Sequence, residues 1–289
     1  MTSVTLSGSG ELTQATVNAN LGTATVVIID GYTSIGLAAF VAKNQITSVT
    51  IGNSVTSIGE IAFWLCTNLT SVTVGNSVTS IAGAAFKNCT RLASITFGNS
   101  VTSIGGSAFL DCTSLASITI GNSVTSIDVG AFQGCTNLTS VTIGNSVTSI
   151  GLSVFQGCTS LASITFGNSV TSISLTAFQG CTNLTSITIG NSVTSIDDNA
   201  FQNSGLTTVY IANGKVISGV TFQSPASGVS FFGKIVTTIE PSAPAAPSAP
   251  RIPIRSLFTN NAQVYYKPHS LASGGIGSVR NCRFKSKKT

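Results

Sequence analysis

Apolar residues recur along most of the chain in an arrangement that repeats every 23 residues. The octapeptide Ile-Gly-Asn-Ser-Val-Thr-Ser-Ile, varied only at its first residue, begins at positions 51, 74, 97, 120, 143, 166 and 189. A degenerate copy, Ile28–Ile35, lies one period upstream. Self-similarity at a fixed period of this length indicates a solenoid, in which each copy forms one coil and stacked coils share a continuous core.

Each copy predicts the same succession of elements. Residues 138–143 predict a strand, because their apolar side chains at 141 and 143 alternate with hydroxyl side chains. A Gly-Asn-Ser turn separates this strand from a second extended piece at 147–150. Residues 129–135 predict one helical turn, whose Ala, Phe and Cys face inward at near-helical spacing. The predicted fold class is therefore a repeat solenoid with a β-strand and a short helical turn in each repeat.

The period also divides the chain into segments. The repeats account for about eight coils, and the stretches around them differ in composition. We predict an N-terminal cap at 1–27, the solenoid at 28–211, a β-rich C-terminal cap at 212–240, a Pro/Ala/Ser linker at 241–250 and a basic tail at 251–289.

The repeated pattern Leu-x-x-Val-x-Ile-x-x-x-Val-x-x-Ile, followed by Phe and Cys as in Leu138–Phe155 and Cys158, resembles the BspA-type leucine-rich repeat. The resemblance covers 28–211, and Gly-Asn-Ser stands where that family usually has a proline. It implies a right-handed leucine-rich-repeat coil. It also implies a non-catalytic binding scaffold, similar to surface antigens and adhesins of bacteria and protists.

The strand hydroxyls form the most regular outward feature of the predicted solenoid. Two parallel ranks of Ser and Thr would lie on one sheet face, a candidate surface for a protein or glycan ligand. We call this surface the hydroxyl face, and its members are Ser71, Thr73, Ser94, Thr96, Ser117, Thr119, Ser140, Thr142, Ser163, Thr165, Ser186 and Thr188. A second set, made of Thr56, Ser57 and their equivalents, would lie beside it, and its threonines form a second rank. Alternatives are a purely structural spacer and an ice-binding face, and threonine also simply suits strands.

The sequence contains few residues arranged for catalysis or metal binding. Six of the seven cysteines recur at one repeat position, where they would form a straight row instead of the tetrahedron that zinc requires. We expect them to be buried thiols that fill space beside Phe. The one histidine, His269, lies in the tail, and the acidic residues recur at no matched spacing. The sequence therefore predicts no enzyme, no cofactor and no metal site.

Charge divides the chain into two unlike parts. Only 7% of residues are charged, well below the usual quarter or so. Residues 1–240 hold five Lys/Arg and eight Asp/Glu, a net charge of −3, whereas 241–289 hold eight Lys/Arg and no acid, a net charge of +8, which together give +5. The candidate residues for an anionic partner are Arg280, Arg283, Lys285, Lys287 and Lys288. This end could contact nucleic acid, attach the solenoid to a particle or envelope, or have no role.

The sequence contains few signals of cellular location. The N-terminus lacks the charged and apolar regions of a secretory signal, and no run of 18 apolar residues predicts a transmembrane helix. The family resemblance implies a cell-surface or virion-associated protein; without it, the sequence is compatible with the cytoplasm.

Overall fold

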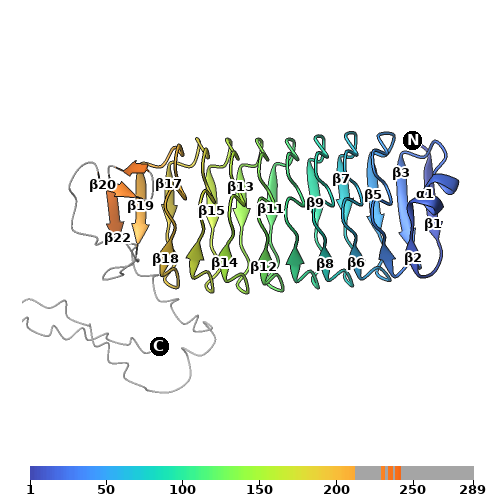
Figure 1. Cartoon of the computed structure of the whole chain (residues 1–289), viewed down its shortest axis with the longest axis horizontal. Helices are drawn as coiled ribbons and strands as arrows, with labels where there is room; N and C mark the ends of the chain where they lie inside the picture. Colours follow the sequence, from blue (N-terminus) through green and yellow to red (C-terminus); the bar gives the residue numbers. More distant parts are fainter. Residues whose placement is uncertain (212–228, 232–233, 237, 242–289) are drawn as a thin grey trace, which may run out of the picture. The chain divides into compact units, whose positions relative to one another are not determined.

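The computed structural model describes residues 1–211 and, beyond them, the backbone of 229–231, 234–236 and 238–241. Residues 1–211 wind into nine complete coils, and each coil contributes one strand to a first sheet and a shorter strand to a second sheet (Figure 1). Neighbouring coils lie side by side, and their strands pair in parallel. The predicted solenoid is therefore confirmed.

The first sheet contains the longer strand of every coil. Partners one coil apart share the same repeat position, as in the alignment of Thr119 with Thr142 and of Thr142 with Thr165. Its strands are β1 (Ser3–Ser7), β3 (Val26–Asp30), β5 (Ser48–Ile51), β7 (Ser71–Thr73), β9 (Ser94–Thr96), β11 (Ser117–Thr119), β13 (Ser140–Thr142), β15 (Ser163–Thr165), β17 (Ser186–Thr188) and β19 (Thr208–Ile211).

The second sheet contains the short Ser-Ile strand that ends each octapeptide. The serine lies at or near the surface and the isoleucine is buried, while in the first coil Glu11 and the buried Leu12 take these places. Its strands are β2 (Glu11–Leu12), β4 (Ser34–Ile35), β6 (Ser57–Ile58), β8 (Ser80–Ile81), β10 (Ser103–Ile104), β12 (Ser126–Ile127), β14 (Ser149–Ile150), β16 (Ser172–Ile173) and β18 (Ser195–Ile196).

The N-terminal segment forms a coil of its own. Strand β1 pairs with β3, strand β2 pairs with β4, and the helix α1 (Gln14–Asn20) follows them. The hydroxyl of Thr13 caps this helix by accepting a hydrogen bond from the backbone N–H of Thr16. Val17 on the helix is fully buried, so this segment closes one end of the core.

The first repeat is shifted by one residue from the sequence alignment. Ile29, not Ile28, pairs with Ile51, whereas Ile35 keeps the 23-residue spacing to Ile58. The turn between the two strands is therefore one residue shorter in this coil than in the next. As a consequence Ile28 faces outward and is 39% exposed.

The segment before and after each core phenylalanine is a chain of turns, so the expected helical turn is wrong. Around Phe132, backbone N–H groups alternate in direction: the N–H of Gln133 bonds within the coil to Gly130, whereas the N–H of Phe132 bonds to Val154 in the next coil. Gly130 and Gly134, two residues on either side of Phe132, have positive φ. In a helix, all of these N–H groups would donate to carbonyl oxygens of the same segment, and every residue of the segment would have negative φ.

Alanine at one of these positive-φ glycines is expected to be costly. Gly157 has φ +72°, and an added Cβ would lie 3.9 Å from the nearest atom, so Gly157→Ala meets strain without a clash. We expect it to lower the free energy of unfolding by about 1–2 kcal/mol. The matched control is Gly121→Ala, because Gly121 has no positive φ and open space around it. Urea denaturation should show no loss for the control; equal losses for both variants would contradict this account.

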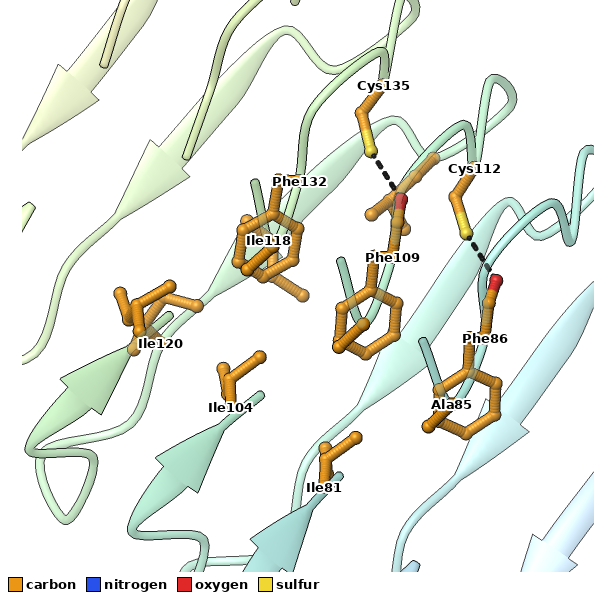
Figure 2. Packing of buried hydrophobic residues seen from close by; sticks show 14 of the residues in the cluster. Ile81, Ala85, Phe86, Ile104, Phe109, Cys112, Ile118, Ile120, Phe132 and Cys135 are labelled. Atoms are coloured by element: carbon orange, nitrogen blue, oxygen red, sulfur yellow. Dashed lines mark hydrogen bonds between the residues drawn. The ribbon is translucent and has the colours of Figure 1, made fainter. Parts of the chain in front are cut away.

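The core consists of columns of equivalent side chains that run from coil to coil. Figure 2 shows Phe86, Phe109 and Phe132 in one such column, with isoleucines packed beside it. The rings of Phe109 and Phe132 are stacked with centroids 5.2 Å apart, and those of Phe132 and Phe155 are 5.6 Å apart. All of these rings are completely buried. The side chains of each coil are therefore covered by those of the neighbouring coils.

Two breaks interrupt the first sheet. Within the described residues β9 does not pair with β11, nor β15 with β17. Each break comes directly after a coil with phenylalanine, Phe97 or Phe166, where most other coils have isoleucine. Both rings are only partly buried and contact the core phenylalanine of the same coil edge-on or tilted. A bulky ring therefore coincides with both breaks of the first sheet, whereas the second sheet has a break of its own between β12 and β14, where Ile120 and Ile143 take this position.

Three further strands lie beyond the repeats. Strand β22 (Thr238–Pro241) pairs in parallel with β19, while β20 (Val229–Phe231) and β21 (Lys234–Val236) form an antiparallel pair. These strands fall in the predicted C-terminal cap at 212–240, and Pro241 of the predicted linker ends β22. The predicted tail at 251–289 lies outside the described residues.

Candidate functional site: the hydroxyl face

The hydroxyl face lies on the outer side of the first sheet. In β13, Val141 is buried while Thr142 is exposed, because successive strand side chains point to opposite faces. The six threonines of the face are all exposed, and its six serines are exposed or half-buried. Because the pairing places equivalent residues opposite each other, the hydroxyls form two in-register rows, which are interrupted at the two sheet breaks.

The threonine hydroxyls of this face are free of internal partners. Within the described residues, none of the six makes a hydrogen bond to another protein group, and among the serines only Ser71 bonds another hydroxyl, that of Ser48. Each hydroxyl can both donate and accept. The face therefore offers unused hydrogen-bonding capacity to a ligand or to water.

The second rank of threonines, by contrast, is used by the scaffold. The hydroxyl of Thr125 donates to the backbone oxygen of Thr102 at 3.2 Å, and the same contact joins Thr102 to Thr79 at 3.0 Å. The turn asparagines are used in a similar way, since the side-chain oxygen of Asn122 accepts from the backbone N–H of Asn145. The sequence did not distinguish these structural columns from the free one.

The hydroxyl face is also uncharged. Its two rows continue from Ser48 and Thr50 to Thr208 and Tyr210 without an acidic or basic residue. The half-buried Tyr210 extends the threonine row at its C-terminal end. A neutral surface of this kind does not select ligands by long-range charge.

The recurrent cysteines are fully buried in the core. The thiol of Cys112 donates to the backbone oxygen of Phe86, and that of Cys135 to Phe109, as the dashed lines in Figure 2 show. Burial raises the pKa of Cys66, Cys135 and Cys181 to about 12 and raises the pKa of Cys89, Cys112 and Cys158 well above the ordinary value. Protonated, hydrogen-bonded thiols are weak nucleophiles and poor metal ligands.

No candidate catalytic centre is assembled in the described part of the chain. Its His, Cys, Asp and Glu residues form no group of three or more able to hold a metal ion. None of its helices has the length and apolar character needed to cross a bilayer. His269 and the basic residues Arg280, Arg283, Lys285, Lys287 and Lys288 lie outside the described residues, so the anionic-partner site stays a prediction.

One surface feature was missed by the sequence-based reasoning. The position three residues before the core phenylalanine is exposed in most coils and carries aliphatic residues in three adjacent coils, Val129, Leu152 and Leu175. The available signal was their variation: this position and its two direct neighbours differ from coil to coil, whereas the core phenylalanine repeats in every coil.

The sequence pattern and the fold match known proteins. Residues 16–135 and 102–228 match the BspA type leucine-rich repeat region, in six copies. The structure of a leucine-rich repeat protein of T. pallidum, TpLRR, is 31% identical, with a TM-score of 0.54 over 57% of this chain and 80% of that chain. It supports the same solenoid fold.

Two other solved structures resemble parts of the chain. A leucine-rich repeat protein from Bacteroides ovatus is 28% identical, with a TM-score of 0.49 over 66% of this chain and 58% of its own. A leucine-rich cell surface protein from Faecalibacterium prausnitzii is 22% identical, with a TM-score of 0.30 over 78% and 89%. No curated protein matches the chain.

Proposed function

Because this chain belongs to the BspA-type leucine-rich-repeat family, we propose that it is a non-catalytic binding scaffold whose hydroxyl face takes a protein or glycan ligand. The observation that carries the proposal is the contrast between threonine columns. Within the described residues, the second-rank hydroxyls bond the neighbouring coil at every position except Thr148, whereas those of Thr119, Thr142 and Thr165 are exposed and make no hydrogen bond. A solenoid presents such groups at a fixed spacing over a long surface.

The proposed setting is the surface of a cell or particle. The family's resemblance to surface antigens and adhesins supports this setting. A scaffold of this kind needs no reactive group, and the buried thiols provide none. A ligand would be held by many hydroxyl contacts, each modest in free energy, because a hydrogen bond exchanges with one to water.

Charge placed on the hydroxyl face is expected to weaken ligand binding strongly. In a triple variant with Thr119→Asp, Thr142→Asp and Thr165→Asp, binding on glycan arrays and in protein pull-down experiments should weaken about tenfold or more, because carboxylates are costly to desolvate. A triple variant with valine at the same positions removes the hydroxyls without adding charge. It should lose binding while its urea denaturation stays unchanged, because these hydroxyls bond nothing in the fold.

The matched control is Thr125→Val in the second rank. It should keep ligand binding and lower the free energy of unfolding by about 0.5–1.5 kcal/mol, because its hydroxyl bonds Thr102. Equal ligand binding by wild type and both triple variants would refute the proposed face. Thermal hysteresis of a freezing solution would instead identify ice binding. If no ligand binding and no thermal hysteresis are measured, the remaining interpretation is a structural spacer.

A further inference from the structure

A second surface, separate from the hydroxyl face, is apolar. Val129, Leu152 and Leu175 occupy the same repeat position in successive coils, three residues before the core phenylalanine, and are 52%, 40% and 41% exposed. We call these three residues the aliphatic row. Single exposed apolar side chains are common, but contiguous ones mark interaction surfaces.

Backbone hydrogen bonds hold the aliphatic row together. The N–H of Gly130, next to Val129, donates to the oxygen of Leu152 at 2.9 Å, and the N–H of Ser153 donates to the oxygen of Leu175 at 3.2 Å. Adjacent members are therefore one coil apart, about 4.8 Å. The row is a continuous aliphatic strip about 10 Å long.

Carboxylates stand at both ends of the aliphatic row. Asp128 directly precedes Val129, and Asp198 takes the same repeat position as the row in the next coil beyond Leu175. The neighbouring Asp197 accepts a hydrogen bond from the backbone N–H of Leu175 at 3.2 Å. All three aspartates are exposed.

These carboxylates have no basic side chain nearby in sequence. Residues 92–211 contain no Lys, Arg or His, and three of their four acidic residues are the aspartates at the row. The basic residues of the earlier coils, Lys43, Lys87 and Arg91, follow the core phenylalanine instead of preceding it. Among residues 92–211 no basic side chain compensates the negative field at the row, and this field selects a cationic partner over a second copy of the same surface.

The spacing of the carboxylates sets the form of that partner. Asp128 and Asp197 are three coils apart, about 14 Å at strand spacing. An extended peptide covers about 13 Å in four residues. We propose that the aliphatic row binds an extended cationic segment of the form Lys/Arg-x-aliphatic-x-Lys/Arg, whose central side chain packs on Leu152 while its two cations reach Asp128 and the Asp197/Asp198 end. Val and Leu side chains supply the apolar contact, and the aspartates fix the register.

A labelled peptide tests this proposal on the full chain. The probe is Ser-Gly-Lys-Thr-Val-Thr-Lys-Gly-Ser, and its control has the same composition with the two lysines adjacent. Fluorescence anisotropy should show the probe bound about threefold or more tighter than the control. The double variant Leu152→Ser and Leu175→Ser should weaken probe binding about tenfold. The double variant Asp128→Asn and Asp197→Asn should weaken it about threefold and reduce its salt dependence.

Three results would overturn the proposal: no binding of the probe up to millimolar concentration, equal binding of both peptides, or undiminished binding by the leucine variant. The last would show attraction to carboxylates alone. The Thr119→Asp, Thr142→Asp and Thr165→Asp variant is the control for charge elsewhere, and it should bind the probe as wild type does. This variant has an altered hydroxyl face and an intact aliphatic row. Loss of ligand binding at the hydroxyl face can therefore be told apart from loss of peptide binding at the aliphatic row.

Discussion

Replacing Phe132 with alanine will lower the free energy of unfolding by about 3–5 kcal/mol. Its ring is completely buried between the rings of Phe109 and Phe155, stacked at 5.2 and 5.6 Å. The loss combines the transfer of the ring to water with a cavity that the coils on either side cannot close, since their own backbone hydrogen bonds fix their spacing. Urea denaturation followed by circular dichroism measures the change.

A second phenylalanine serves as the control for size. Phe166 is partly buried and meets the ring of Phe178 edge-on at 6.2 Å, next to a break in the first sheet. Phe166→Ala should therefore cost less, about 1–2 kcal/mol. If the two substitutions cost the same, the phenylalanine column would not be the main support of the stack.

Raising the pH from 8 to 10 will strongly destabilise the protein. In the unfolded chain thiols ionise near pH 8.5–9, whereas burial raises the pKa of Cys66, Cys135 and Cys181 to about 12. The folded state therefore keeps protons that the unfolded chain loses. Stability is fully present below the unfolded pKa and is lost as pH rises toward 12.

The size of this effect follows from proton linkage. Each thiol loses about 1.4 kcal/mol per pH unit above its unfolded pKa, so these three lose about 4 kcal/mol by pH 10. Cys89, Cys112 and Cys158, whose pKa values are also raised by burial, act in the same direction. Urea titrations at pH 7, 8, 9 and 10 give the slope.

Serine substitution tests whether the thiols cause the slope. Ser204 takes the cysteine position in the last repeat and is buried there, so the site accepts a hydroxyl. A variant with Cys66→Ser, Cys135→Ser and Cys181→Ser should lose stability more gradually above pH 8, because its hydroxyls do not ionise in this range. An unchanged slope would attribute the alkaline unfolding to other groups.

The sequence predicted the coil and its interior because those depend on periodicity. The Ala, Phe and Cys columns were assigned correctly to the inside, as were the apolar strand residues, of which Ile95, Phe97, Ile164 and Phe166 are only partly buried. The helical turn was wrong because Ala131, Phe132 and Cys135 have spacing that suits a helix equally well. Glycines at 130 and 134, both with positive φ, were a visible sign of turns, but Ile61 and Leu65 occupy the same two positions in another coil and give none.

Surface properties were harder to predict, because they depend on contacts between coils. Thr125 and Thr142 both face outward, and only the structure shows that the hydroxyl of Thr125 bonds a backbone oxygen 23 residues away. Similarly, the choice between Ile28 and Ile29 for the first strand depends on a turn one residue shorter than the others. Because both residues are isoleucine, the sequence alone does not show which of them pairs with Ile51.

The constant register between coils also bears on how such a protein can change in length. Gain or loss of one 23-residue copy within the regular repeats leaves the paired junctions chemically alike, since equivalent residues face each other across them. Copy number then adjusts the reach of the molecule and the valency of its outer surface in unit steps of about 4.8 Å. Fold and ligand chemistry stay the same while avidity varies.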